Sequence, residues 1–169
     1  MDISMTIKPK TDQLNADDLI GGAKTIRIRD VKATDSEVQP VSIFFDGDNN
    51  KPYKPSLGMR RVLVSLWGTD AKAFIGRSLT LYRDDKVKFG GIEVGGIRIS
   101  HASHINEPTR VLETISRGRR RPLTIEPIKK PKIRDIEKAK EAILEGKYTF
   151  DQINQMYELT QNQIEKLKL

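Results

Sequence analysis

The chain has 169 residues but no cysteine and only two histidines. Disulfide bonds and cysteine-ligated zinc sites are therefore excluded. His101, His104 and Glu107 are spaced three apart, but they follow a strand pattern and have no fourth ligand nearby, so we expect no metal site. GxSxG and P-loop motifs are also absent, and two histidines leave little room for acid–base chemistry. We therefore expect a protein that is not an enzyme and that needs no cofactor.

Long apolar segments are missing as well. No stretch of about 18 apolar residues occurs, which excludes a membrane-spanning helix. Residues 1–18 have no apolar core and carry acidic residues early, so they do not resemble a secretory signal. These absences predict a cytoplasmic location and no membrane partner.

The composition allows one core and leaves an excess of positive charge. Apolar residues make up 37% of the chain, enough for a core of about 100 residues. Charged residues make up 31%, and the formal net charge is +7. Basic proteins attract polyanions through long-range electrostatics and counterion release. The composition favours a nucleic-acid partner, and a basic surface without such a partner is the alternative.

Alternating apolar and polar residues predict strands on both sides of one helix. An apolar stripe with spacings of three and four over 57–67 predicts the helix, with Ser56 as its N-cap and Gly68 as its stop. Strands are expected before and after this helix. Their inward residues are predicted to be Ile26, Ile28, Val41, Ile43, Phe45, Leu79, Leu81, Val87, Phe89, Ile97 and Ile99.

Glycines bend the second group of predicted strands. Four glycines fall within residues 90–96. Glycines inside strands are typical of bulges and sharp bends, which small barrels need in order to close. We therefore predict a mainly β fold, with residues 24–116 forming a small barrel with an inserted helix, similar to the oligonucleotide-binding (OB) barrel.

The regions outside the predicted barrel differ from it in composition. Residues 1–23 form a polar lead-in. Residues 117–134 hold eight cationic residues against Glu126 alone, and three prolines make a helix there unfavourable, so we predict a stiff basic linker. Residues 135–169 have a helical pattern with two capping boxes, at 149–152 and 160–163. This short helical tail is too small to be secure alone, and we expect it to dock on the barrel or on a partner.

The outward side chains of the predicted strands mix cations with aromatic residues. Surfaces of this kind bind single-stranded nucleic acids, because aromatic rings stack on bases and cations hold phosphates. A solvated strand face is the alternative, since lysine and arginine also reduce edge-to-edge aggregation. The predicted nucleic-acid-binding residues are Arg27, Arg29, Phe44, Tyr53, Tyr82, Lys86, Lys88, Arg98, Arg117, Arg119, Arg120 and Arg121, with the three aromatic residues as candidates for stacking.

Residues 59–105 also resemble a known group of proteins. The MRRVL helix, the GRSLTLYRD junction and the GGIEVGGIRISHASHI segment are similar to a family of small bacteriophage and prophage proteins, most of them without an assigned function. Together with the barrel pattern, the resemblance implies an OB-fold single-stranded DNA-binding protein of phage replication or recombination, acting in the host cytoplasm. Many such proteins end in an acidic tail, whereas this chain ends in IEKLKL, so partner recruitment through an acidic tail is not expected.

The function predicted from the sequence is therefore sequence-tolerant binding of single-stranded DNA. A phage replication or recombination protein is a further expected partner, through the C-terminal helices, and a homo-oligomer is left open. Two alternatives also stay open. The chain could be a virion or protein-interaction component that uses its helical tail, or an accessory DNA-binding factor in which residues 149–167 act like a helix-turn-helix.

Overall fold

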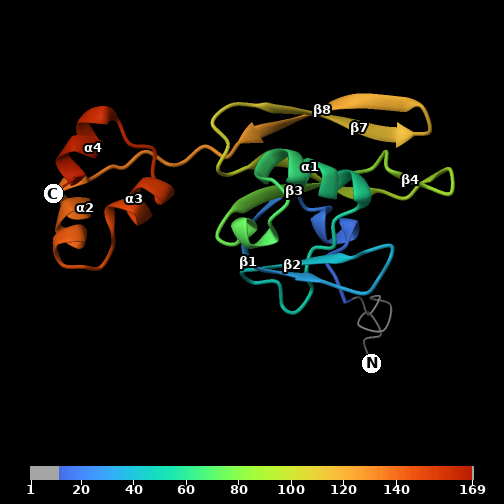
Figure 1. The fold of residues 1–169 in the computed structure, drawn as a ribbon, viewed down its shortest axis with the longest axis horizontal. Helices are drawn as coiled ribbons and strands as arrows, with labels where there is room; N and C mark the ends of the chain where they lie inside the picture. The colour runs from blue at the N-terminus through green and yellow to red at the C-terminus, as the bar shows by residue number, and fades with distance from the viewer. Residues whose placement is uncertain (1–11, 169) are drawn as a thin grey trace. The chain divides into compact units, whose positions relative to one another are not determined.

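The computed structural model describes residues 12–168, which lie in two compact units, Met1–Ile128 and Lys129–Leu169 (Figure 1). Part of the expected lead-in, residues 1–11, lies outside the described residues. The strands are β1 (Lys24–Ala33), β2 (Val41–Phe45), β3 (Ser78–Asp84), β4 (Lys88–Phe89), β5 (Ile92–Glu93), β6 (Gly96–Ala102), β7 (Thr109–Ser116) and β8 (Arg119–Pro127). The helices are η2 (Ala16–Leu19) and η3 (Ala71–Phe74), both 3-10, and α1 (Leu57–Trp67), α2 (Ile136–Leu144), α3 (Phe150–Met156) and α4 (Gln161–Leu167).

Six strands of the first unit form one mixed sheet in the order β2-β1-β3-β6-β8-β7. Its neighbours are antiparallel except β6 and β8, which are parallel and pair only where His101 and Ala102 meet Glu126 and Pro127. β4 and β5 form a separate two-stranded sheet. The predicted mainly β class with helices is confirmed. The predicted OB-like barrel goes further than the structure does: residues 12–168 form no closed barrel, because β2 and β7 are the two edge strands of the sheet.

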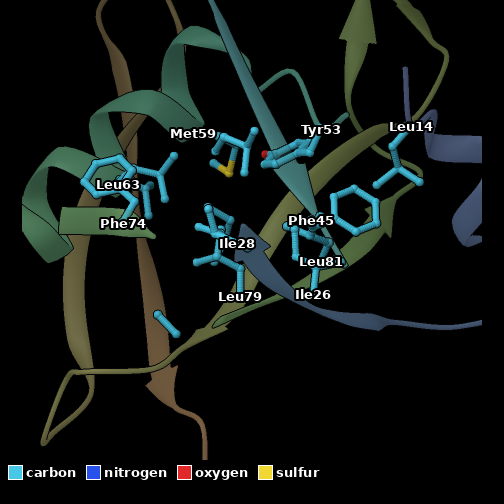
Figure 2. Close-up of a cluster of buried hydrophobic side chains, with 14 of the residues drawn as sticks. Leu14, Ile26, Ile28, Phe45, Tyr53, Met59, Leu63, Phe74, Leu79 and Leu81 are labelled. Carbon is cyan, nitrogen blue, oxygen red and sulfur yellow. The ribbon is translucent and has the colours of Figure 1, made fainter. Parts of the chain in front are cut away.

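The core of this unit is built from the aliphatic residues of five strands, β1, β2, β3, β6 and β8, and one face of α1. Figure 2 shows Ile26, Ile28, Leu79 and Leu81 facing Met59 and its neighbours on the helix, and each of these four strand residues is at most 2% exposed. Burial of each such side chain contributes about 1.5–3 kcal/mol relative to exposure. The predicted inward positions on β1, β2, β3 and β6 are confirmed as buried or partly buried.

The predicted boundaries of α1 are confirmed by its caps. The Ser56 hydroxyl accepts a hydrogen bond from the Met59 backbone N–H, and the Gly68 N–H donates to the Val64 carbonyl. Gly68 has a φ of 85°, which residues with a Cβ rarely adopt. At the end of the helix, the Trp67 Nε1–H donates to the Ser103 carbonyl over 2.9 Å. This bond ties α1 to the segment that follows β6.

Two segments of the first unit, around Phe89 and over residues 119–127, differ from what the sequence predicts. The alternation predicts Phe89 in the core, but it is 81% exposed, because β4 and β5 extend only two residues each and form a hairpin of their own. The composition predicts a linker over residues 117–134, but residues 119–127 of this segment form β8. Prolines are compatible with this strand because β8 pairs with β6 only at its last two residues, so Pro122 needs no N–H toward that side.

The second unit consists of α2, α3 and α4 around a small core of Ala139, Ile153 and Leu167. Both predicted capping boxes are present: the hydroxyls of Thr149 and Thr160 accept from backbone N–H groups three residues on, and the glutamine side chains there bond back. No helix among residues 12–168 is long and apolar enough to cross a membrane.

Candidate nucleic-acid interface

The β4–β5 hairpin begins directly after β3 and is fixed at its base by backbone bonds. The N–H groups of Val94 and Gly95 both donate to the Val87 carbonyl, over 3.0 and 3.1 Å. At the turn, Gly90 and Gly91 have φ values of 59° and 82°. Two successive positive φ angles are typical of a type I′ turn, whose twist matches that of paired strands. The sequence thus specifies a short, regular hairpin rather than a flexible loop.

The β7–β8 hairpin carries most of the arginine cluster. Its strands are joined at Arg117 and Gly118, and Gly118 has a φ of 76°. Along β8, successive side chains point to opposite faces, so Arg119 and Arg121 share one face and Arg120 lies on the other. In Figure 1, this turn and the β4–β5 hairpin project from the same end of the sheet.

A cleft of about 660 Å³ lies between the two hairpins, and we name it the interhairpin cleft. β8 pairs with β6 only at Glu126 and Pro127. Over the preceding part of β8, from Arg119 to Ile125, the two strands are not paired, and the cleft lies beside this part. The N-terminal end of α1, at Ser56 and Gly58, also lines it. Its charged lining residues are Lys86, Lys88, Arg98, Arg119, Arg121 and Glu113.

Four charged side chains form a closed ring at the cleft, which we name the charge ring: Asp84, Arg98, Glu113 and Arg121. Arg98 donates through Nε to Asp84 over 2.6 Å and through a terminal nitrogen to Glu113. Arg121 donates to the same two carboxylates, over 3.2 and 3.3 Å. The ring joins β3, β6, β7 and β8, so it holds the β7–β8 hairpin to the rest of the sheet.

The Asp84 carboxylate of the ring is held in its charged form. Burial by itself would raise the pKa of Asp84, but the Lys86 backbone N–H, Arg98 and Arg121 outweigh it, and the pKa lies below its ordinary value. Glu113 is only 7% exposed, and its Oε1 lies 3.5 Å from the place where a Cβ on Gly58 would stand. The positive end of α1 therefore adds to the stabilisation of Glu113 by the two arginines.

Three further cations line the cleft outside the charge ring. Lys86, Lys88 and Arg119 form no ion pair with any residue in 12–168, and all three are exposed, although Glu93 lies across the β4–β5 hairpin from Lys88. Because the ring balances two arginines against two acids, these three side chains leave the cleft with a surplus of positive charge. An anion in the cleft would meet them without displacing an existing partner.

The β1–β2 part of the predicted binding surface lies in a different place and is internally paired. Arg29 binds Asp48 through both carboxylate oxygens, at 3.2 and 3.1 Å. Burial alone would raise the pKa of Asp48, yet backbone N–H groups of Asn50 and Phe45, together with Arg29, lower it. Phe44 lies beneath Arg29 and Lys32, whose charges are 5.7 and 5.1 Å from its ring centre. None of these residues lines the interhairpin cleft.

Other predicted residues are likewise separate from the cleft. Arg27 is exposed and 3.5 Å from Asp46. Tyr82 is half-buried and lines a small hollow beside η2. Arg117 and Arg120 are exposed at the β7–β8 turn, next to the cleft but outside its lining.

Tyr53 is a core residue and not the exposed loop aromatic that the sequence suggests. It is 1% exposed, and its backbone pairs with Ile43 in both directions. Burial raises the pKa of its hydroxyl, which has no hydrogen-bond partner among the described residues. Pairing with β2 holds this tyrosine against the core, so Tyr53 is unavailable for stacking on a base.

Sequence reasoning misses that Phe89 is exposed. Phe89 and Ile92 face each other across the turn of the β4–β5 hairpin, at 81% and 69% exposure. The alternation of Val87 and Phe89 with Lys86 and Lys88 resembles that of a core strand. The signal against a core strand is the spacing, because only residues 86–89 separate Asp84-Asp85 from Gly90-Gly91 in the sequence.

Comparison with known proteins does not add an identity. No protein-family model, no curated protein and no solved structure matches the chain. The function is therefore argued from the cleft and its surroundings.

Proposed function

We propose that this protein binds single-stranded DNA in the interhairpin cleft. The observation on which this rests is the unpaired positive charge of Lys86, Lys88 and Arg119, gathered from two hairpins that are about 30 residues apart in sequence. Lysine and arginine side chains in a groove hold a nucleic-acid backbone by releasing its counterions. Arg117 and Arg120 lie beside the cleft and lengthen this track.

The dimensions of the cleft favour one strand over a duplex. A volume of about 660 Å³ is within the range of 300–1,000 Å³ typical of pockets for drug-sized molecules. One or two nucleotides have that size, whereas a duplex is far wider. The walls of the cleft are hairpins. OB barrels also bind single strands between strands and hairpins that hold phosphates and bases, and the proposal uses this mode of binding without requiring a closed barrel.

The sequence predicts that Arg98 and Arg121 bind nucleic acid, whereas in this proposal the charge ring mainly holds the hairpins in place. Arg98 is too deeply paired to leave its carboxylates, with its side chain 11% exposed. It shapes the cleft by fixing the hairpins. Arg121 is 39% exposed and sits at the edge of the ring, so it adds to the field at the cleft without being a free cation.

The test compares a double variant at the cleft with a charge-matched control. Lys86→Ala combined with Lys88→Ala removes two unpaired cations. Lys51→Ala combined with Lys72→Ala removes two exposed lysines that do not line the cleft. Fluorescence anisotropy with a labelled oligo-dT gives the affinity at several salt concentrations.

We expect the cleft variant to bind more weakly and to have a smaller salt dependence. On single strands, the slope of log affinity against log salt falls by about 0.7 for each phosphate that the protein no longer neutralises. The control should keep the slope of the unmodified protein. Equal slopes in all three proteins would remove the cleft from the binding site.

From the phage resemblance we assign this activity, as part of the same proposal, to replication or recombination of phage DNA in the host cytoplasm. The C-terminal helices would then contact a replication or recombination protein. The two alternative functions remain predictions, and no contact or charge pattern in α3 or α4 favours the helix-turn-helix alternative over the cleft.

A further inference from the structure

Several large apolar side chains are exposed together at the end of the β4–β5 hairpin. We name Phe89, Gly90, Gly91 and Ile92 the hairpin tip. Phe89 is 81% exposed, Ile92 is 69% exposed, and Val94 beside the tip is 49% exposed. Single exposed apolar residues are ordinary, but a cluster at one projecting point marks a contact site.

These side chains are not needed to hold the hairpin together. Its base is fixed by the two bonds to the Val87 carbonyl, and Arg83 donates to the Val94 carbonyl over 3.4 Å. Neither Phe89 nor Ile92 belongs to the core cluster. The hairpin thus presents an aromatic ring on a fixed support, at little structural benefit to the fold.

The charges around the tip select its partner. Lys88 precedes Phe89 directly and lies across the hairpin from Glu93, while Lys86 and Arg119 line the adjoining cleft and form no ion pair within residues 12–168. Two copies of the chain meeting tip to tip would bring these lysines together, which is unfavourable. A base attached to a phosphate satisfies both features, because its flat face covers the ring and its phosphate lies near the cations.

We propose that Phe89, which lies beside the cleft and not in its lining, stacks on a base of the bound strand where that strand passes the hairpin tip, with Ile92 as a second apolar contact. This inference rests on the proposed function. It explains how the protein would bind a strand with unpaired bases more tightly than a sugar-phosphate backbone without bases. A base inside a duplex is covered on both faces, so Phe89 can stack only where a base is unpaired or unstacked. Stacking recognises the ring face and is tolerant of sequence.

The experiment varies two things independently, the side chain at position 89 and the presence of bases in the oligonucleotide, so that their coupling in the binding free energy can be measured. Anisotropy is measured with oligo-dT and with an abasic oligonucleotide of the same length and charge, for the unmodified protein, Phe89→Ala and Phe89→Trp. Val38→Ala serves as control, because Val38 is also 81% exposed but belongs to the connection between β1 and β2 and not to the β4–β5 hairpin. Because Phe89 is outside the core, these variants are expected to fold normally.

We expect Phe89→Ala to bind oligo-dT roughly 10- to 100-fold more weakly, with an unchanged salt slope. Phe89→Trp and Val38→Ala should bind like the unmodified protein. On the abasic oligonucleotide, Phe89→Ala and the unmodified protein should have the same affinity, because no base is present to stack.

The possible failures are distinguishable. If the lysine variant loses affinity but Phe89→Ala does not, the cleft binds DNA and Phe89 does not stack. An equal loss on both oligonucleotides would also overturn the inference. A change of molecular mass in Phe89→Ala, measured by sedimentation, would overturn it too and identify a second copy of the chain as the partner of the tip. If neither variant changes binding, the proposed function itself fails.

Discussion

Arg98 of β6 donates a hydrogen bond to Glu113 of β7, although β8 lies between those two strands in the sheet. The bond is possible because β8 has diverged from β6 at this level, which also opens the interhairpin cleft. Glu113 is the point at which α1, β6 and β8 meet β7. The floor of the proposed site is thus a structural ion network.

Replacing Glu113 by Gln should destabilise the protein by about 1–3 kcal/mol. The amide keeps the shape of the side chain but leaves the buried Arg98 guanidinium with one carboxylate in place of two. Urea unfolding measures the change. Asp46→Asn is the control, because its pair with Arg27 is exposed on both sides and should contribute less than about 0.5 kcal/mol. Equal stability of the two variants would mean that the ring does not hold the hairpin.

Acid should weaken the fold partly through Asp84 and Asp48. Both carboxyls have a pKa below the ordinary value of 3.8, so each stabilises the folded state at pH values above that point. This contribution is lost as the pH falls through the lowered pKa values. In Asp84→Asn, stability at neutral pH should be lower and its decline below pH 3.8 shallower. An unchanged acid transition, relative to the exposed-site variant Asp35→Asn, would contradict the assigned ring.

Gly96 is predicted to tolerate no side chain. A Cβ there would lie 2.8 Å from Val87 Cγ1 and 3.0 Å from its Cβ, and a β-branched side chain cannot turn away freely. Gly96→Ala should therefore shift the hairpin base and cost about 1–3 kcal/mol. Gly21→Ala has nothing within 4 Å and should leave the midpoint of thermal unfolding nearly unchanged. If both variants melt together, the hairpin base is looser than described.

Tyr53 offers a test that separates the core from the binding site. Tyr53→Phe removes a buried hydroxyl without a partner in the described residues, so stability should stay the same or rise by about 1 kcal/mol. Affinity for oligo-dT should not change. A loss of affinity with intact stability would return Tyr53 to the binding surface.

The elements that local rules control can be predicted from the sequence. Alternation locates β1, β2, β3 and β6, because Ile26, Ile28, Leu79 and Leu81 all face one core. Capping chemistry locates α1 and the two boxes of the tail, since a threonine or serine side chain satisfies backbone donors within the same turn.

The remaining features depend on contacts between distant segments. Alternation around Phe89 is the same for a buried strand and a free hairpin, and only the missing cover distinguishes them. Prolines in 119–127 exclude a helix but permit a strand whose one side is mostly unpaired. Five predicted cations do line one cleft, but the pairing of Arg98 and Arg121 with Asp84 and Glu113 could not be read from the sequence, because the four residues come from four strands.

The central claim is that one cleft holds one unpaired strand. Its most direct test is fluorescence anisotropy of the unmodified protein with a labelled oligo-dT of about 30 nucleotides, beside the matching duplex, at two salt concentrations. We expect tight binding to the single strand, weaker binding to the duplex, and a steep loss of single-strand affinity with salt. Weak binding of equal strength to the single strand and to the duplex, lost at the higher salt concentration, would contradict the proposal. Exposed arginines on any surface would give that result.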